Sequence, residues 1–278
     1  CRSTEHEISY LTDVTGRQPA IRGLDFMDND YLGVTQRAKD WWARGGIPTI
    51  CWHTGADFFS GYPECRESEL DWAFAFVDGT EANRRLLDGL DHAVPYLKRL
   101  QSDGVPVLWR PFHEMDGGWF WWGASGADAY LQLYKLMYDR LTNVHGLNNL
   151  IWVWNGQDAA WYPGDEYVDI IGEDIYPGKH VYTSQAARFI KALSYTDTRK
   201  LITLSENGCI PDPEQLVRDN IMWSYWCVWE GEFVLKAAGF NNYSEQYTEK
   251  NMLKKAYKSD TVITRKELPD LRNYPLGD

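Results

Sequence analysis

The chain alternates short, nearly continuous apolar runs with longer stretches in which apolar side chains recur every three or four residues. Uninterrupted apolar runs of this length are typical of parallel strands that are covered on both faces. Polar or aromatic residues close several of the runs, as Trp52-His53 and His113-Glu114 do. The pattern predicts strands over residues 21–27, 47–53, 105–113, 149–155, 168–176, 200–206 and 222–229.

The stretches between these runs have helical periodicity. Over residues 128–141, leucines and tyrosines fall on one stripe, which predicts an amphipathic helix. Leucines and a valine form the same kind of stripe over 82–100, and Pro95 predicts a kink in that helix. Residues 5–15 have the pattern of a further helix ahead of the first apolar run.

Strands that alternate with helices indicate βαβ units and a parallel sheet. Neither GxGxxG nor GxxxxGK[ST] occurs, although a doubly wound sheet usually carries such a phosphate loop. Polar and aromatic residues at the strand ends favour a (β/α)8 TIM barrel, whose active site lies there. With no linker or repeat, residues 1–278 are predicted to be a single catalytic barrel domain. Because only seven strands can be counted, we expect this sequence to begin inside the first βα loop, without the first strand.

The composition excludes several classes of protein. With 28 Lys and Arg against 40 Asp and Glu, the net charge is −12, which argues against nucleic acid or anionic lipid as a partner. A mean hydropathy of −0.48 and the lack of a long apolar run argue against a membrane span. The five cysteines are too scattered for a disulfide scaffold, and none has zinc-ligand spacing. The 14 Trp, 17 Tyr and 10 Phe exceed the needs of a core and suit the stacking of sugar rings.

Two glutamates at strand ends indicate the chemistry. The stretch 109–123 runs from a strand into Arg110, His113 and Glu114, then through two glycines into four consecutive aromatic residues. Glu206 ends another apolar run. Two carboxylates that face each other across a barrel mouth are what glycosidic bond cleavage requires, because one protonates the leaving oxygen while the other attacks or activates water. A separation of about 5–5.5 Å predicts retention, and roughly 6.5–9.5 Å predicts inversion.

These motifs resemble glycoside hydrolase family 26, the β-mannanase family of clan A. Arg110-Pro-Phe-His-Glu-Met115 with the aromatic stretch that follows is similar to the family's acid/base motif at the fourth strand. The other similar blocks, which extend the resemblance in order from about Thr15 to Asp270, are Gly45–His53, Ile151–Asn155, Val168–Pro177 and Ser205–Gly208.

The resemblance implies roles for individual residues. Glu114 would be the general acid/base and Glu206 the nucleophile of a retaining reaction, at strands four and seven of the barrel. The substrate-binding residues would be His53, Arg110, His113, Trp119, Tyr176 and Trp229, with Arg110 also holding the carboxylates and Tyr176 orienting Glu206. Further tryptophans are candidates either for additional subsites or for core packing: Trp52, Trp121, Trp122, Trp154 and Trp161. Asp116 and Glu173 depart from the family pattern, with a change of pKa or of a subsite as the expected effect.

The resemblance therefore implies a secreted endo-β-1,4-mannanase that acts on mannan, glucomannan or galactomannan by double displacement, without a cofactor or a metal. Within the same chemistry, a hydrolase of mixed-linkage β-glucan or β-1,3-xylan and an exo-acting mannobiohydrolase stay open. A non-catalytic carbohydrate-binding protein is the alternative from another class, and both carboxylates argue against it. Additional modules in the natural full-length protein are compatible with a catalytic domain of this size.

Overall fold

The computed structural model describes residues 5–236 and 242–275. Its strands are β1 (Ile21–Asp25), β2 (Ile47–Trp52), β3 (Val107–Pro111), β4 (Leu150–Asn155), β5 (Ile170–Ile175), β6 (Leu201–Asn207) and β7 (Trp226–Val228). Each strand begins inside one of the seven apolar runs, so the strand prediction is confirmed. Its α-helices are α1 (His6–Thr15), α2 (Tyr31–Ala43), α3 (Tyr62–Glu67), α4 (Glu81–His92), α5 (Val94–Ser102), α6 (Trp121–Ala124), α7 (Ala127–Asp139), α8 (Ala186–Leu193), α9 (Pro213–Asp219) and α10 (Lys250–Lys258).

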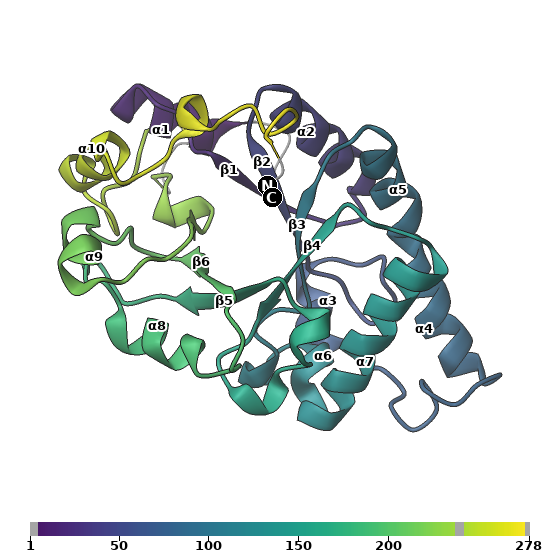
Figure 1. The fold of residues 1–278 in the computed structure, drawn as a ribbon. Coiled ribbons are helices and arrows are strands. Elements are labelled where there is room, and N and C mark those ends of the chain that lie inside the picture. The colour runs from purple at the N-terminus through teal and green to yellow at the C-terminus, as the bar shows by residue number, and fades with distance from the viewer. Residues whose placement is uncertain (1–4, 237–241, 276–278) are drawn as a thin grey trace.

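The strands form one parallel series in sequence order, β1 to β7, and curve into a nearly closed barrel with the helices outside it (Figure 1). Short 3₁₀ turns lie in the connections at Met115–Gly117, Ala159–Trp161, Asp165–Tyr167, Gly231–Phe233 and Arg265–Glu267, and a π-helical turn, Arg140–Val144, extends α7. The predicted barrel class is thereby confirmed. Its consequence for the site is that every strand ends at the same mouth.

The helix expected over 82–100 is in fact two helices, α4 and α5, which meet at Ala93. Pro95 lies in the first turn of α5, where a missing backbone N–H costs nothing and the fixed φ favours a helix start. Pro95 therefore does not kink one long helix, as expected, but stands where a second helix begins. Thr80 begins α4 by accepting the N–H of Asn83 at 3.1 Å, as a capping side chain does.

Between barrel and helices lies a core rich in indole rings. Trp52, Trp121, Trp122 and Trp154 are each 2% exposed or less, and they pack against other aromatic rings. Trp161 is half-buried and packs on Tyr130. Of the two interpretations open for these tryptophans, core packing fits all five. The aromatic excess is thus divided between the core and the cleft described below.

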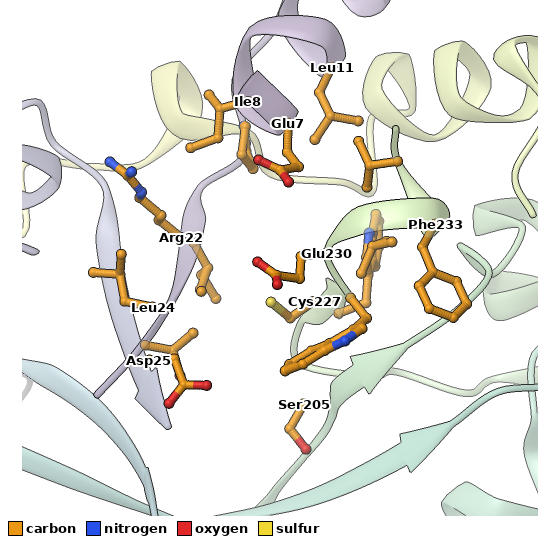
Figure 2. A pocket seen from close by; sticks show the side chains of 18 of the residues that line it. Glu7, Ile8, Leu11, Arg22, Leu24, Asp25, Ser205, Cys227, Glu230 and Phe233 are labelled. Carbon is orange, nitrogen blue, oxygen red and sulfur yellow. The ribbon is translucent and has the colours of Figure 1, made fainter. Parts of the chain in front are cut away.

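The seam between β7 and β1 separates the two edge strands of the described sheet, which do not pair with each other. The strands come close there, because a Cβ added to Gly23 on β1 would lie 3.1 Å from Sγ of Cys227 on β7. A cavity of about 150 Å³ lies at the seam, and α1 contributes Ile8 and Leu11 to its wall (Figure 2). Helix α1 also lies beside α10 (Figure 1), in a small second core that covers the seam from outside.

Two expectations from the sequence concern membrane spans and disulfides. Within residues 5–236 and 242–275, no helix has both the length and the apolar character that crossing a bilayer requires. Cys51, Cys65, Cys209 and Cys227 are free thiols, which agrees with the expectation that the cysteines are not a disulfide scaffold.

Candidate active site

An open cleft of about 730 Å³ lies at the carboxyl ends of the strands, a volume suited to a small ligand or several sugar units. Both expected catalytic carboxylates, Glu114 and Glu206, line it. So do five of the six residues expected to bind substrate: His53, His113, Trp119, Tyr176 and Trp229. The sixth, Arg110, is only 4% exposed and lies behind the carboxylates.

Glu114 projects from a strained segment that follows β3. Phe112 and Glu114 both have positive φ, of 49° and 53°, which is uncommon for residues with a side chain and costly to maintain. The backbone N–H of Glu114 donates to the carbonyl oxygen of Asn155 at 2.9 Å, which ties this segment to the end of β4. The strain directs the carboxyl group of Glu114 into the cleft, where it meets the indole of Trp119.

The surroundings of Glu114 favour its protonated form. Burial is the main cause that raises its pKa, and the negative charge of Glu206 raises it further. The charge of Arg110 and the hydrogen bond from Nε1 of Trp119 to Oε2, at 3.2 Å, act in the opposite direction. The net direction is upward, as a general acid that works near neutral pH requires.

Glu206 is held in place through both of its oxygens. The Tyr176 hydroxyl donates to Oε1, and Nη2 of Arg110 donates to Oε2 at 2.8 Å. The pairing of β5 with β6 shifts register at this point, because Asp174 pairs with Glu206 directly after Glu173 pairs with Leu204. A bulge of this kind re-aims side chains next to active sites. Here Glu206 lines the cleft, and Ser205, the residue before it, bonds to Asn155 and Asp174 behind the cleft.

Behind the two glutamates, Arg110 connects three strands. Its Nη1 donates to Oδ1 of Asn155 at 2.5 Å and to Oδ2 of Asp174 at 3.1 Å. The Ser205 hydroxyl donates to Oδ1 of the same aspartate at 3.0 Å. Burial, with the nearby charges of Glu206 and Glu114 adding to it, raises the pKa of Asp174 well above its usual value, against the effect of Arg110. The positive charge of the Arg110 guanidinium thus compensates negative charge on the carboxylates around it.

The three acids are close enough to act together. One carboxylate oxygen from each of Glu114, Asp174 and Glu206 lies within 4.8 Å of the others, and such a set can also hold a cation. The buried Arg110 already supplies positive charge to this cluster. The guanidinium of Arg110 therefore serves as the counter-ion of these carboxylates.

A second group of potential metal ligands consists of Asp25, Cys51 and His53, also within 4.8 Å of one another and all buried. Burial, with the charge of Asp25, raises the pKa of the Cys51 thiol well above its usual value, and Sγ lies 3.5 Å from the carbonyl oxygen of Leu24. Metal binding needs the thiolate. In this structure the thiol of Cys51 bonds to the carbonyl oxygen of Leu24, and Asp25 bonds to His53.

The two cleft histidines, His53 and His113, meet edge to face, with ring centroids 4.5 Å apart. Burial and the positive charge of Arg110 lower the pKa of His113 well below its usual value, so this ring is neutral at pH 7. Its buried Nδ1 has no hydrogen-bond partner among the described residues. A neutral ring in the cleft wall can exchange a hydrogen bond with a sugar hydroxyl without adding charge beside Glu114.

Comparison with known proteins adds to this geometry. A family model described as glycosyl hydrolase family 26 matches residues 2–267, most of the chain. The chain belongs to glycosyl hydrolase family 26. A mannan endo-1,4-beta-mannosidase of Thermothelomyces thermophilus is 35% identical over 93% of this chain and 55% of its own length. A mannan endo-1,4-beta-mannosidase B of a Piromyces species is 35% identical over 92% of this chain and 45% of its own length. The chain thus spans about half the length of these curated relatives.

Solved structures of the family have the same fold. The Podospora anserina GH26-CBM35 beta-(1,4)-mannanase superposes with a TM-score of 0.84 at 32% identity, over 95% of this chain and 61% of that one. A beta-mannanase from a symbiotic protist of the termite Reticulitermes speratus, complexed with gluco-manno-oligosaccharide, gives a TM-score of 0.83 at 34% identity, over 95% of this chain and 84% of that one. The resemblance inferred from the motifs is therefore confirmed at the level of the family.

Several cleft residues of this family 26 chain were not predicted as site residues. They come from helix α3, from other connections between strands, or from polar strand ends: Met27, Asp28, Tyr62, Pro63, Arg66, Phe120, Glu230 and Phe233 in the cleft lining, with Asn155, Asp174 and Ser205 behind it. The last three stand at the ends of β4, β5 and β6, so their place at strand ends was an available signal. The loop residues carry no such signal in one sequence.

Asp116 and Glu173, the two residues expected to depart from the family pattern, are not among the residues that line the cleft. Glu173 is fully buried. Arg188 on α8 donates to its Oε2 at 2.6 Å, and Tyr195, which follows that helix, donates to its Oε1 at 2.8 Å. Burial raises the pKa of Glu173 despite these partners. Asp116 accepts the backbone N–H of Gln157 at 3.2 Å and so joins two loops. Asp116 and Glu173 thus contact the loops and the helix around the barrel.

Proposed function

We propose that this chain is the catalytic domain of a secreted endo-β-1,4-mannanase that cleaves internal bonds of mannan, glucomannan or galactomannan with retention of configuration. The observation that carries the proposal is the pair Glu114 and Glu206, which face one cleft with carboxylate oxygens within 4.8 Å of each other. That upper limit lies below the roughly 6.5–9.5 Å that inversion needs to admit a water molecule, so it supports the retaining geometry of about 5–5.5 Å.

In the first step, the protonated Glu114 gives its proton to the glycosidic oxygen as the bond from that oxygen to the anomeric carbon breaks. A carboxylate oxygen of Glu206 attacks the same carbon from the opposite face, and the leaving chain departs as an alcohol. The raised pKa of Glu114 keeps the proton available for this transfer.

In the second step, Glu114, now a carboxylate, takes a proton from a water molecule whose oxygen attacks the anomeric carbon. The bond to Glu206 breaks, Glu206 leaves as a carboxylate, and Glu114 is again protonated. Each step inverts the anomeric carbon, so the product retains the original configuration. Arg110 and Tyr176 hold Glu206 at the angle that both steps need.

The substrate assignment rests on the relatives and on the walls of the cleft. Relatives that cover most of this chain are named for mannan endo-1,4 cleavage, and one solved relative is complexed with a gluco-manno-oligosaccharide. Trp119 and Tyr176 are each 44% exposed at the cleft, and Trp229 is half-buried there, so flat faces are available for stacking on sugar rings. The open cleft fits an internal segment of a polysaccharide.

The test uses two substitutions with different signatures. Glu206→Ala is expected to lower kcat on mannohexaose by roughly 10⁴-fold or more, because no covalent intermediate can form. Glu114→Ala is expected to lose turnover of mannohexaose and yet release aryl alcohol in a burst from 2,4-dinitrophenyl β-mannobioside, whose leaving group needs no proton. Near wild-type kcat for Glu206→Ala contradicts the assignment.

Controls distinguish the alternatives. Glu173→Gln removes a buried carboxylate that faces away from the cleft and is expected to keep kcat within about threefold. Parallel assays on mannan, lichenan and β-1,3-xylan separate mannanase from glucanase and xylanase activity, and product lengths from mannohexaose separate endo from exo cleavage. Binding of mannan without release of reducing sugar would indicate a non-catalytic protein.

A further inference from the structure

Asp25 and His53 form a buried pair at the edge of the cleft. Asp25 ends β1 and is 7% exposed, and His53 directly follows β2 and is 2% exposed. The parallel register places Asp25 opposite Cys51, two residues before His53, which brings the carboxylate to the histidine's backbone. Figure 2 shows Asp25 at the end of its strand, facing the cavity at the seam.

The carboxylate of Asp25 contacts His53 twice. Oδ1 accepts the backbone N–H of His53 at 3.0 Å, and Oδ2 lies 2.6 Å from Nδ1 of the ring. Burial acts against the ionised form of Asp25, but its interactions with the ring and the backbone N–H of His53 outweigh burial and lower the pKa of Asp25 below its usual value. An ionised carboxylate only accepts hydrogen bonds, so the ring must carry its proton on Nδ1.

The rest of the ring is enclosed by aromatic side chains. His113 lies 4.5 Å away between centroids, Phe120 5.5 Å and Trp229 5.9 Å, all edge to face. These contacts pack the ring on the sides that Asp25 does not occupy. Because Nδ1 is bound by Asp25 and His53 lines the cleft, Nε2 is the nitrogen available to a ligand.

We propose that Asp25 is a positioning residue of this site: it fixes the Nδ1–H tautomer and the orientation of His53, so that Nε2 is presented to the cleft as a hydrogen-bond acceptor for a sugar hydroxyl. The proposal rests on the proposed function for the identity of the ligand. It assigns a role in substrate recognition to β1, a strand that provides neither catalytic glutamate. An acceptor at this place selects a substrate that carries a hydroxyl hydrogen within its reach.

Asp25→Asn tests the proton's place directly. The asparagine keeps the shape and its carbonyl can still accept the backbone N–H, but its amide would donate to Nδ1 and so move the ring proton to Nε2. We expect kcat/KM on mannohexaose to fall roughly tenfold, the effect of one lost hydrogen bond to substrate, with a larger change in KM than in kcat.

A double-mutant cycle separates positioning from a structural role. In a His53→Phe background, Asp25→Asn should change kcat/KM by less than about twofold, because Asp25 then has no ring to orient. An equal loss in both backgrounds overturns the proposal. Asp91→Asn is the matched control, since Asp91 also accepts from a histidine, Nε2 of His145 at 2.7 Å, but lies on α4 away from the cleft; its kcat/KM should stay unchanged.

A measurement on the wild-type protein keeps the proposal testable if Asp25→Asn fails to fold. With ¹⁵N-labelled histidine, long-range ¹H–¹⁵N spectra distinguish the protonated from the unprotonated ring nitrogen, and His53→Phe assigns the His53 signals by their loss. A proton on Nδ1 alone supports the proposal, and a proton on Nε2 overturns it. This readout needs no turnover, so a failure of the proposed function would show separately, as a wild-type chain that leaves mannohexaose intact.

Discussion

Glu114 is the residue whose surroundings act most clearly in opposite directions. Burial and Glu206 raise its pKa, while Arg110 and the Trp119 indole lower it. The general acid must be protonated when substrate binds, so its pKa sets the alkaline limb of kcat/KM. The pH dependence of kcat/KM therefore reports the pKa of Glu114, a residue that was predicted from one motif.

Trp119→Phe should move that limb to higher pH. The substitution keeps an aromatic ring but removes the Nε1–H that stabilises the ionised form of Glu114, so the pKa of Glu114 rises further. A pH profile of kcat/KM on mannohexaose measures the shift, separately from any loss of stacking, which lowers the whole profile. Trp161→Phe, half-buried against Tyr130, should leave the limb in place. A shift of the limb to lower pH in Trp119→Phe would contradict this account.

Among single residues, the sequence predicted a site residue most directly where that residue stands in a long motif. Glu114 stands in a motif of more than ten residues, and Glu206 gained its weight as a second acid at a strand end. Asp25 ends β1, and Asp174 lies one residue before the end of β5. That position was a signal, but it does not distinguish these two acids from strand-end acids without a role in a site. Their importance comes from partners far away in sequence, such as Arg110 for Asp174, and only the folded chain brings these together.

At the scale of elements, apolar runs located all seven strands because both faces of a parallel strand are buried. The break between α4 and α5 was not predicted, since proline in a first turn and proline in a helix interior look alike in sequence. The bulge between β5 and β6 was also out of reach, because register depends on the partner strand. That bulge positions Glu206, so the part of the site that could not be predicted is its fine geometry.

Glu173→Gln tests how β5 is attached to its helix. The carboxylate accepts two bonds from Arg188 of α8 and one from Tyr195, and a neutral amide cannot satisfy all three. We expect the free energy of unfolding to fall by about 1–3 kcal/mol, measured by urea denaturation, while kcat changes by less than about threefold. Glu166→Gln, at an exposed position, is the control with a change below about 0.5 kcal/mol. A loss of kcat by orders of magnitude in Glu173→Gln would show that this acid acts on the site through Asp174.

On the scale of the whole molecule, the composition predicted stacking of sugar rings, and the alternation of strands and helices predicted a barrel. The structure shows where the aromatic excess goes. Buried indoles such as Trp52 and Trp154 fill the space around the strands, while Trp119 and Trp229 line the cleft. How closely β1 and β7 approach could not be predicted, because it depends on the packing of residues far apart in the sequence. Gly23 and Cys227 define that approach.

Gly23→Ala should destabilise the barrel, because the new methyl group would lie 3.1 Å from Sγ of Cys227 across the seam. Overpacking of this kind costs about 1–3 kcal/mol, measurable as a lower midpoint of thermal unfolding. Cys227→Ala removes the sulfur, so the double variant should recover most of the loss relative to Cys227→Ala alone. Equal losses in both backgrounds would show that the seam is not packed in this way.

The central claim is that Glu114 and Glu206 cleave β-mannosidic bonds by double displacement, and the anomeric configuration of the first product tests it most directly. Wild-type protein is mixed with mannohexaose, and ¹H NMR spectra are recorded before mutarotation equilibrates the reducing ends. Retention predicts that the new reducing ends appear first as the β-anomer and that the α-anomer accumulates only later, at the rate of mutarotation. New reducing ends that appear first as the α-anomer would contradict the account.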